Sequence, residues 1–98
     1  MTASGKAFAI GQVTIKNQPL WETYKTALSV TLLLYKGEVL FRGQVSEVLS
    51  GKPTHTDVVI MQFASIEALN AWFSSAQYQE IIALRDMAAD VTLTSYAS

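Results

Sequence analysis

The chain has 98 residues, of which 50% are hydrophobic and 15% charged, and its formal net charge is -1 at pH 7. This length allows one hydrophobic core, so we expect a single domain over residues 1–98. The seven Lys and Arg are scattered rather than gathered in a basic stripe, which argues against a nucleic-acid partner. No run approaches the ~18 apolar residues of a membrane span, so no membrane insertion is expected.

The chain contains no cysteine, which excludes disulfides, thiol nucleophiles and cysteine metal sites. This composition fits a reducing compartment, and the N-terminus carries no long apolar run, so we expect a soluble cytoplasmic protein. The hydrophobic fraction is high for so small a domain. Part of the surface is therefore expected to be covered by a partner.

The first two predicted elements are a strand and a long helix. Residues 7–15 (AFAIGQVTI) are rich in β-branched and apolar types and predict a buried strand. Pro19 favours a helix start, capped by one of the two residues before it. The helix reaches Gly37 or the residue before it, although residues 30–34 alone would also fit a strand. Its apolar stripe comprises Leu20, Tyr24, Ala27, Leu28, Thr31, Leu32 and Tyr35.

A hairpin is predicted next. Residues 38–49 return to a β pattern, and Gly43 in the middle of the run invites a bulge or a bend. Residues 50–54 (SGKPT) form a turn. Residues 57–63 (DVVIMQF) are the most continuous apolar β run of the chain, as expected of a central strand.

The last third predicts a second helical region and a final strand. Ser65 is a good N-cap for a helix that is interrupted at Ser74 and Ser75. Further helical turns are predicted from residue 77 to about 87, and residues 91–96 alternate as a last strand. No linker or low-complexity tract divides the chain.

The order β, α, β, β, α, β predicts an α+β fold of the ferredoxin-like class, with a four-stranded antiparallel sheet in the order 4-1-3-2. Both crossovers are right-handed, so both helices lie on one face of the sheet. The other face is apolar on either side-chain parity, and such a surface is too apolar to leave in water. A second copy of the chain is the simplest cover, which predicts a homodimer.

Three segments of the chain resemble a known family: AFAIGQVTIKNQPLWETY, KGEVLFRGQVSEVLSG and FASIEALNAWFSSAQYQEIIALRDMAAD. Together they are similar to the domain of unknown function 1330 family, a branch of the dimeric α/β-barrel superfamily, over about residues 7 to 96. The most specific pieces are Arg42-Gly43, the series Trp72, Ser75, Tyr78 and Gln79, and Arg85. Relatives usually carry a second glycine beside Gly37, where this chain has Lys36. The resemblance implies a homodimer whose two sheets face each other as a barrel, and it assigns no reaction.

Gln12, Arg42 and Gln62 share side-chain parity with apolar residues on three neighbouring strands, so we expect one polar row on the face that lines the barrel. A guanidinium between two carboxamides would bind a carboxylate or an enolate. Two alternatives stay open for Arg42. It can be an inward-pointing charge that protects a sheet edge, or the ionic partner of a carboxylate in the other subunit.

Tyr24, Trp72 and Tyr78 lie on helix faces that should meet the sheet, and a buried phenol or indole needs a polar partner. They are candidates for the same ligand site, although aromatic residues at helical spacing are more often core packing. Arg85 complements the end of a helix, which favours a structural role.

No metal site and no cofactor are expected. His55 is the only histidine, and a lone histidine without cysteines cannot supply a set of metal ligands. It lies in the predicted hairpin turn, so we interpret it as a solvent-exposed residue. The eight acids show no spacing typical of a catalytic pair, and the glycines match no phosphate-binding motif.

These observations support two functions. The first is a homodimeric binding protein of unassigned role that holds a small, partly apolar, anionic ligand between the first helix and the sheet. The second is a cofactor-independent monooxygenase or isomerase of an enolisable aromatic or lactone, with Arg42 stabilising the anion and Tyr24 donating a proton. A purely structural dimer is the third alternative. An enclosed cavity with convergent polar groups would favour an enzyme, whereas a packed interface would neutralise Arg42.

Overall fold

The computed structural model describes residues 5–98. The elements follow the order β1 (Ala7–Ile15), α1 (Gln18–Leu34), β2 (Glu38–Gln44), β3 (Asp57–Phe63), α2 (Ile66–Ser74), α3 (Ala76–Gln79), α4 (Ile82–Ala88) and β4 (Ala89–Ala97). The strands form one antiparallel sheet in the order β2-β3-β1-β4. The predicted ferredoxin-like fold and its strand order are therefore confirmed.

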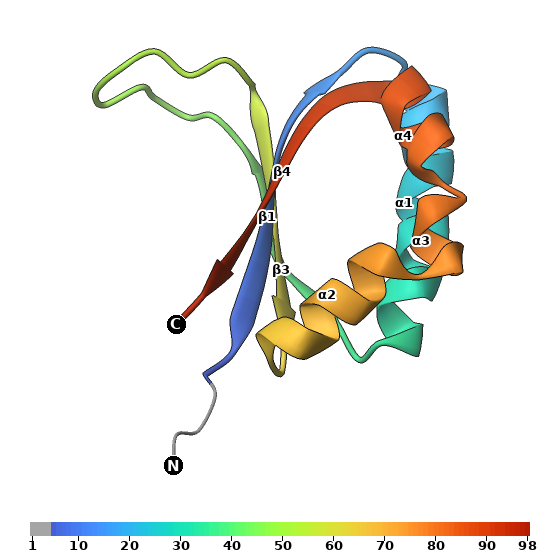
Figure 1. Ribbon diagram of the computed structural model, residues 1–98. Coiled ribbons are helices and arrows are strands. Elements are labelled where there is room, and N and C mark those ends of the chain that lie inside the picture. Colours follow the sequence, from blue (N-terminus) through green and yellow to red (C-terminus); the bar gives the residue numbers. More distant parts are fainter. Residues whose placement is uncertain (1–4) are drawn as a thin grey trace.

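All helices lie on one side of the sheet, and the loop between β2 and β3 extends on the other side (Figure 1). The core lies between these layers. On β1 the helix-facing side carries Ala7, Ala9 and Val13, and the helices contribute large side chains such as Leu28 and Trp72. Small residues on the strand leave room for these large helical residues, which brings the helix layer close to the sheet.

The N-terminus of α1 is capped as its sequence predicts. Asn17 Oδ1 accepts a hydrogen bond from the Leu20 N–H at 3.1 Å, and Pro19 lies in the first turn. This bond satisfies a backbone donor that has no partner inside the helix. The run at residues 30–34 is helical, so the alternative strand is not formed.

The C-terminus of α1 is closed by a turn at Lys36. The Lys36 N–H donates to the Leu33 carbonyl at 3.3 Å, and the Gly37 N–H donates to the Leu32 carbonyl at 2.9 Å. Lys36 has a φ of 57°, the left-handed conformation that usually selects glycine at this position. The chain thus forms the turn with a lysine. Gly37 is required for a different reason: a Cβ at this position would lie 2.5 Å from the Phe63 ring.

β2 differs from its prediction in length and in register. The strand ends at Gln44, which pairs with Asp57, the first residue of β3, rather than continuing to Leu49. Residues 46–55 therefore have no strand with which to pair. The register shifts between Val39 and Phe41, so Leu40 is the extra residue of a bulge. Gly43 is paired regularly; a Cβ there would lie 2.6 Å from the Phe41 ring, so this glycine makes room for that side chain.

The later elements also deviate slightly from their predicted bounds. The helical stretch predicted for residues 77–87 is divided into α3 and α4, because the helix is interrupted at Glu80 and Ile81. β4 begins at Ala89, two residues before the predicted start, since its pairing with β1 extends to Ile15. Neither change affects the topology.

The side of the sheet away from the helices carries an apolar patch among polar residues. Paired strand residues share a face, so the register aligns Phe41, Ile60 and Ile10 across three strands, and Phe8 with Tyr96 in a neighbouring row. Phe41 and Tyr96 are 55% and 52% exposed. We call this surface the open face of the sheet.

Candidate functional site

A cavity of about 300 Å³ lies between the N-terminal half of α1 and the sheet, on the helix-facing side near β2. It is lined by Val13, Ile15, Gln18, Trp21, Lys25, Arg42, Gly43, Gln44, Asp57, Val58 and Val59. Its volume is at the lower end of the range of about 300–1,000 Å³ that small-molecule pockets occupy. We call it the α1 cavity.

Arg42 reaches the α1 cavity because of the bulge in β2. The extra residue Leu40 places Arg42 opposite Val59, whose side chain is buried beneath the helices. Within residues 5–98, Arg42 forms neither an ion pair nor a side-chain hydrogen bond. Burial lowers the pKa of Arg42 and nearby Tyr24 and Glu22 oppose this effect, but arginine stays charged in proteins. The cavity wall thus carries a cation with unused donors.

Lys25 is a second cation of the α1 cavity, but its charge is compensated locally. Its Nζ lies 3.1 Å from Glu22 Oε1, and Gln18 Nε2 donates to Glu22 Oε2 at 2.6 Å. Contacts with Lys25 and then Gln18 lower the pKa of Glu22, so the carboxylate stays ionised. Arg42 is therefore the cation available to a ligand.

The predicted polar row of Gln12, Arg42 and Gln62 is not formed. Gln12 pairs with Val58 and Gln62 pairs with Phe8, which places both carboxamides on the open face, opposite to Arg42. Gln62 Nε2 instead donates to Glu38 Oε1 at 3.1 Å. An uninterrupted strand with a side-chain period of two would form this row, but the bulge in β2 moves Arg42 to the other side of the sheet.

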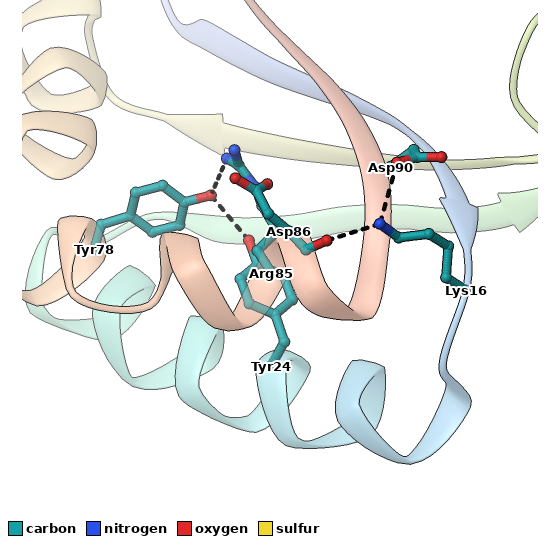
Figure 2. Close-up of polar contacts among 6 residues, drawn as sticks. All are labelled: Lys16, Tyr24, Tyr78, Arg85, Asp86 and Asp90. Carbon is teal, nitrogen blue, oxygen red and sulfur yellow. Dashed lines mark hydrogen bonds and ion pairs between the residues drawn. The ribbon is translucent and has the colours of Figure 1, made fainter.

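Tyr24 and Tyr78 meet in the core rather than at a pocket. Figure 2 shows their hydroxyls pointing toward each other, from α1 and α3, with Arg85 of α4 beside Tyr78. The two oxygens are 2.9 Å apart, and Arg85 Nη1 donates to Tyr78 Oη at 3.1 Å. Burial, reinforced by Tyr78, raises the pKa of Tyr24 well above its ordinary value. Tyr24 is thus held as a neutral phenol.

Arg85 joins this cluster to the surface. Its Nε lies 3.0 Å from Asp86 Oδ1, and Lys16 Nζ donates to the Asp86 carbonyl at 2.9 Å (Figure 2). Burial alone lowers the pKa of Arg85, but Tyr78 and Asp86 outweigh burial and raise it. These contacts agree with the structural role predicted for Arg85.

Trp72 is fully buried and its indole is satisfied. Its Nε1 donates to Thr31 Oγ1 at 3.0 Å, and this hydroxyl donates to the Leu28 carbonyl at 2.8 Å. The rings of Phe63 and Tyr78 pack against it, with centroids 5.2 and 4.4 Å away. Neither Trp72 nor the two buried tyrosines line the α1 cavity. We call Tyr24, Trp72, Tyr78 and Arg85 the aromatic cluster.

Trp21 is a cavity residue that sequence reasoning missed. It is buried, lines the α1 cavity and packs on Tyr24 with a ring-centroid separation of 5.1 Å. Its position three residues before Tyr24 and seven before Leu28 continues the buried face of α1, which is the signal that could have found it. An indole beside a guanidinium offers an apolar wall next to a cationic group.

His55 lies in the predicted loop but is only partly exposed, in contrast to the expectation of a solvent-exposed turn residue. Its Nδ1 lies 3.0 Å from Thr14 Oγ1 and its Nε2 3.1 Å from Thr92 Oγ1, so the ring bridges β1 and β4 on the open face. The end of the β2–β3 loop, directly before β3, therefore contacts the sheet. Among residues 5–98, no group of three His, Asp or Glu side chains could hold a metal ion.

The family comparison is decisive. The family described as Domain of unknown function (DUF1330) matches residues 6–96, nearly the whole chain. The chain belongs to the DUF1330 family. This confirms the resemblance found in the sequence. No curated protein matches the chain in sequence. Within residues 5–98 of this DUF1330 chain, no helix combines the length and apolar character needed to cross a membrane.

Solved structures share the fold at low sequence identity. A protein of unknown function from Rhodopseudomonas palustris is 19% identical with a TM-score of 0.78, covering 98% of this chain and 84% of that one. SnoaB, a cofactor-independent oxygenase from Streptomyces nogalater, is 7% identical with a TM-score of 0.70, covering 96% and 93%. A dimeric ferredoxin-like protein of unknown function from Thermobifida fusca is 12% identical with a TM-score of 0.63, covering 100% and 94%. At these identities the likeness establishes the fold of the DUF1330 chain and no activity.

Proposed function

We propose that this protein is a homodimer that binds a small, partly apolar, anionic ligand between α1 and the sheet. One observation carries the ligand part: the α1 cavity holds Arg42, which has no anionic partner within residues 5–98. A guanidinium binds a carboxylate through two parallel hydrogen bonds. Trp21 and the aliphatic residues Val13 and Ile15 supply the apolar part of the site.

The homodimer rests on the open face of the sheet. Phe8, Ile10 and Ile60 form a continuous apolar surface there with the half-exposed rings of Phe41 and Tyr96. Apolar surfaces of this kind are typical of interfaces, and a self-complementary sheet face suits two-fold symmetry. The dimeric ferredoxin-like neighbour from Thermobifida fusca supports the same assembly by analogy. A second copy of the chain would face this sheet.

Ligand binding is tested by calorimetric titration with 3-phenylpropionate, a small carboxylate with an apolar body. Arg42→Met should weaken binding about 10- to 100-fold, because it removes charge-assisted hydrogen bonds worth roughly 1.5–3 kcal/mol. Lys6→Met is the matched control, since it removes one positive charge from an exposed residue that does not line the α1 cavity. Equal affinities of the wild-type protein and Arg42→Met would contradict the proposed site.

Assembly is tested by light scattering on the full chain. We expect a mass twice the 10.7 kDa of one chain. Phe41→Glu places a charge on the apolar patch of the proposed interface and should yield monomers. Leu33→Glu, on an exposed position of α1, should leave dimers intact. A wild-type mass of one chain at micromolar concentration would refute the homodimer.

The second candidate function is a cofactor-independent oxygenase or isomerase, supported by the fold shared with SnoaB. The role suggested for Tyr24 as proton donor gains no support, because its hydroxyl is buried against Tyr78 and the residue does not line the α1 cavity. The test is oxygen uptake or absorbance change with an enolisable aromatic substrate and the protein alone. Turnover that is lost in Arg42→Met but retained in Tyr24→Phe would favour an enzyme using the α1 cavity.

Three broader expectations remain predictions that accompany this proposal. They are a cytoplasmic location, one domain over residues 1–98, and the absence of a nucleic-acid partner. The scattered basic residues support the last of these.

A further inference from the structure

Besides its two cations, the α1 cavity is lined by an acidic side chain that an anionic ligand leaves unused. Asp57 begins β3 and pairs with Gln44 on one side and Val13 on the other, which places it on the helix-facing side with Arg42. Its Oδ1 accepts a hydrogen bond from Thr56 Oγ1 at 2.7 Å. Within the described part of the chain it forms no ion pair.

Arg42 and Asp57 are close in the sheet, yet they do not pair with each other. Gln44, the partner of Asp57, is two residues beyond Arg42 on the same strand, so the two charged residues are diagonal neighbours. Diagonal neighbours are about 7–8 Å apart, within reach of a long side chain. The cavity therefore presents a cation and an anion side by side, each with unused hydrogen-bonding capacity.

The other charges of the site reinforce this arrangement. Lys25 is occupied by Glu22, and Glu22 also accepts a hydrogen bond from Gln18. The Lys25–Glu22 pair adds no net charge, so the groups left for a ligand are Arg42 and Asp57. A ligand with a single negative charge would satisfy Arg42 and would be repelled by Asp57.

From this geometry we infer that the ligand is zwitterionic: it carries a carboxylate for Arg42 and an ammonium group for Asp57. Its apolar or aromatic body would lie against Trp21 and the aliphatic residues Val13 and Ile15. Amino acids with an apolar or aromatic side chain are the simplest class with these three features. The inference rests on the proposed function, because it names the ligand class of the same cavity.

Three matched ligands test the inference on the full chain by calorimetric titration at neutral pH. L-Phenylalanine carries both charges, 3-phenylpropionate lacks the ammonium, and 2-phenylethylamine lacks the carboxylate. A partly exposed ion pair contributes about threefold to fivefold in affinity, so L-phenylalanine should bind tighter than 3-phenylpropionate by this factor, and 2-phenylethylamine should bind weakest. Asp57→Asn should remove the preference for L-phenylalanine over 3-phenylpropionate. This variant should bind 3-phenylpropionate as tightly as the wild-type protein or more tightly.

The outcomes separate the two proposals. Equal binding of L-phenylalanine and 3-phenylpropionate to the wild-type protein overturns the zwitterionic ligand while the anion site stands. Failure of both carboxylates to bind overturns the proposed function itself. Glu47→Gln is the matched control, because it removes an exposed carboxylate from the loop after β2 and should keep the preference. Since the wild-type comparison is decisive alone, the test does not depend on the folding of Asp57→Asn.

Discussion

The aromatic cluster and the α1 cavity both combine aromatic rings with a guanidinium, but only the first satisfies its polar groups internally. In the cluster, each tyrosine hydroxyl and the Trp72 indole has a partner between 2.9 and 3.1 Å away, and Arg85 is held between Tyr78 and Asp86. In the cavity, Arg42 has no such partner within residues 5–98. Satisfied polar groups stabilise a core, whereas an exposed guanidinium that no group in the described part of the chain occupies is free to bind a ligand at the pocket it lines.

The largest expected effect belongs to the aromatic cluster. Trp72→Ala should lower the free energy of unfolding by about 3–5 kcal/mol, because it leaves a large cavity in the core and removes the indole N–H that Thr31 accepts from. Urea denaturation followed by circular dichroism measures the change. Phe73→Ala is the control on the same helix, since this ring is partly exposed and should cost less. Equal losses of unfolding free energy in Trp72→Ala and Phe73→Ala would mean that burial does not make Trp72 more important for stability than Phe73.

Tyr78→Phe should cost about 1–3 kcal/mol of unfolding free energy, because it leaves the buried Tyr24 hydroxyl without a partner. Tyr24→Phe should cost less, since the Tyr78 hydroxyl keeps its bond from Arg85. Denaturant unfolding of the two single variants and the double variant measures the coupling. A larger loss of unfolding free energy in Tyr24→Phe than in Tyr78→Phe would contradict the arrangement in which Tyr78 bonds to both Tyr24 and Arg85.

Alkaline pH provides a third test of the cluster. The pKa of Tyr24 is raised in the folded protein, so folding keeps this phenol protonated. The stabilising contribution of Tyr24 is complete below pH 10.0, the ordinary pKa of a tyrosine. It is lost as pH rises further, because Tyr24 then ionises in the unfolded chain while it stays protonated in the folded protein. The unfolding free energy should fall by about 1.4 kcal/mol per pH unit from this group. Tyr24→Phe should show a shallower decline than the control Tyr96→Phe, and equal slopes would reject the buried phenol as the cause.

The smallest stability effect is expected at the α1 cavity. Arg42→Met should change the unfolding free energy by no more than about 0.5 kcal/mol, since the guanidinium stabilises no partner in the folded chain. The same variant should weaken ligand binding about 10- to 100-fold. Arg85→Met is the matched comparison, because that guanidinium bonds to Tyr78 and Asp86 and its removal should destabilise the fold. A large loss of stability in Arg42→Met would make Arg42 a structural residue like Arg85.

Much of the fold was predictable because its signals are local. The sequence predicts strands 7–15 and 57–63 with the bounds that the structure shows, since runs rich in β-branched and apolar residues end at turn or capping residues. The N-cap of α1 also follows from neighbouring residues, with Asn17 preceding Pro19 at the correct spacing. The order of the elements along the chain indicates the ferredoxin-like order of the strands, and the handedness of the crossovers places the helices on one face of the sheet.

The candidate site was less predictable because it depends on register. Gly43 was the residue that suggested a bulge, but the extra residue is Leu40, and this difference moves Arg42 to the helix-facing side. His55 contacts Thr14 and Thr92, which lie 41 and 37 positions away from it in the sequence. No local sequence pattern encodes contacts of this kind. The partners of Tyr24 and Trp72 are similarly distant, so the sequence alone left open whether these rings line a pocket or the core.

The extra residue in β2 also has an evolutionary consequence. Removing the codon of Leu40 would restore an unbroken alternation in the strand and transfer Arg42 to the opposite side of the sheet. One deletion could thus withdraw a charge from the cavity and place it where a twin subunit would dock. Related sequences with and without this insertion would be expected to differ in both properties at once, so gain or loss of the site and change of assembly would be inherited together.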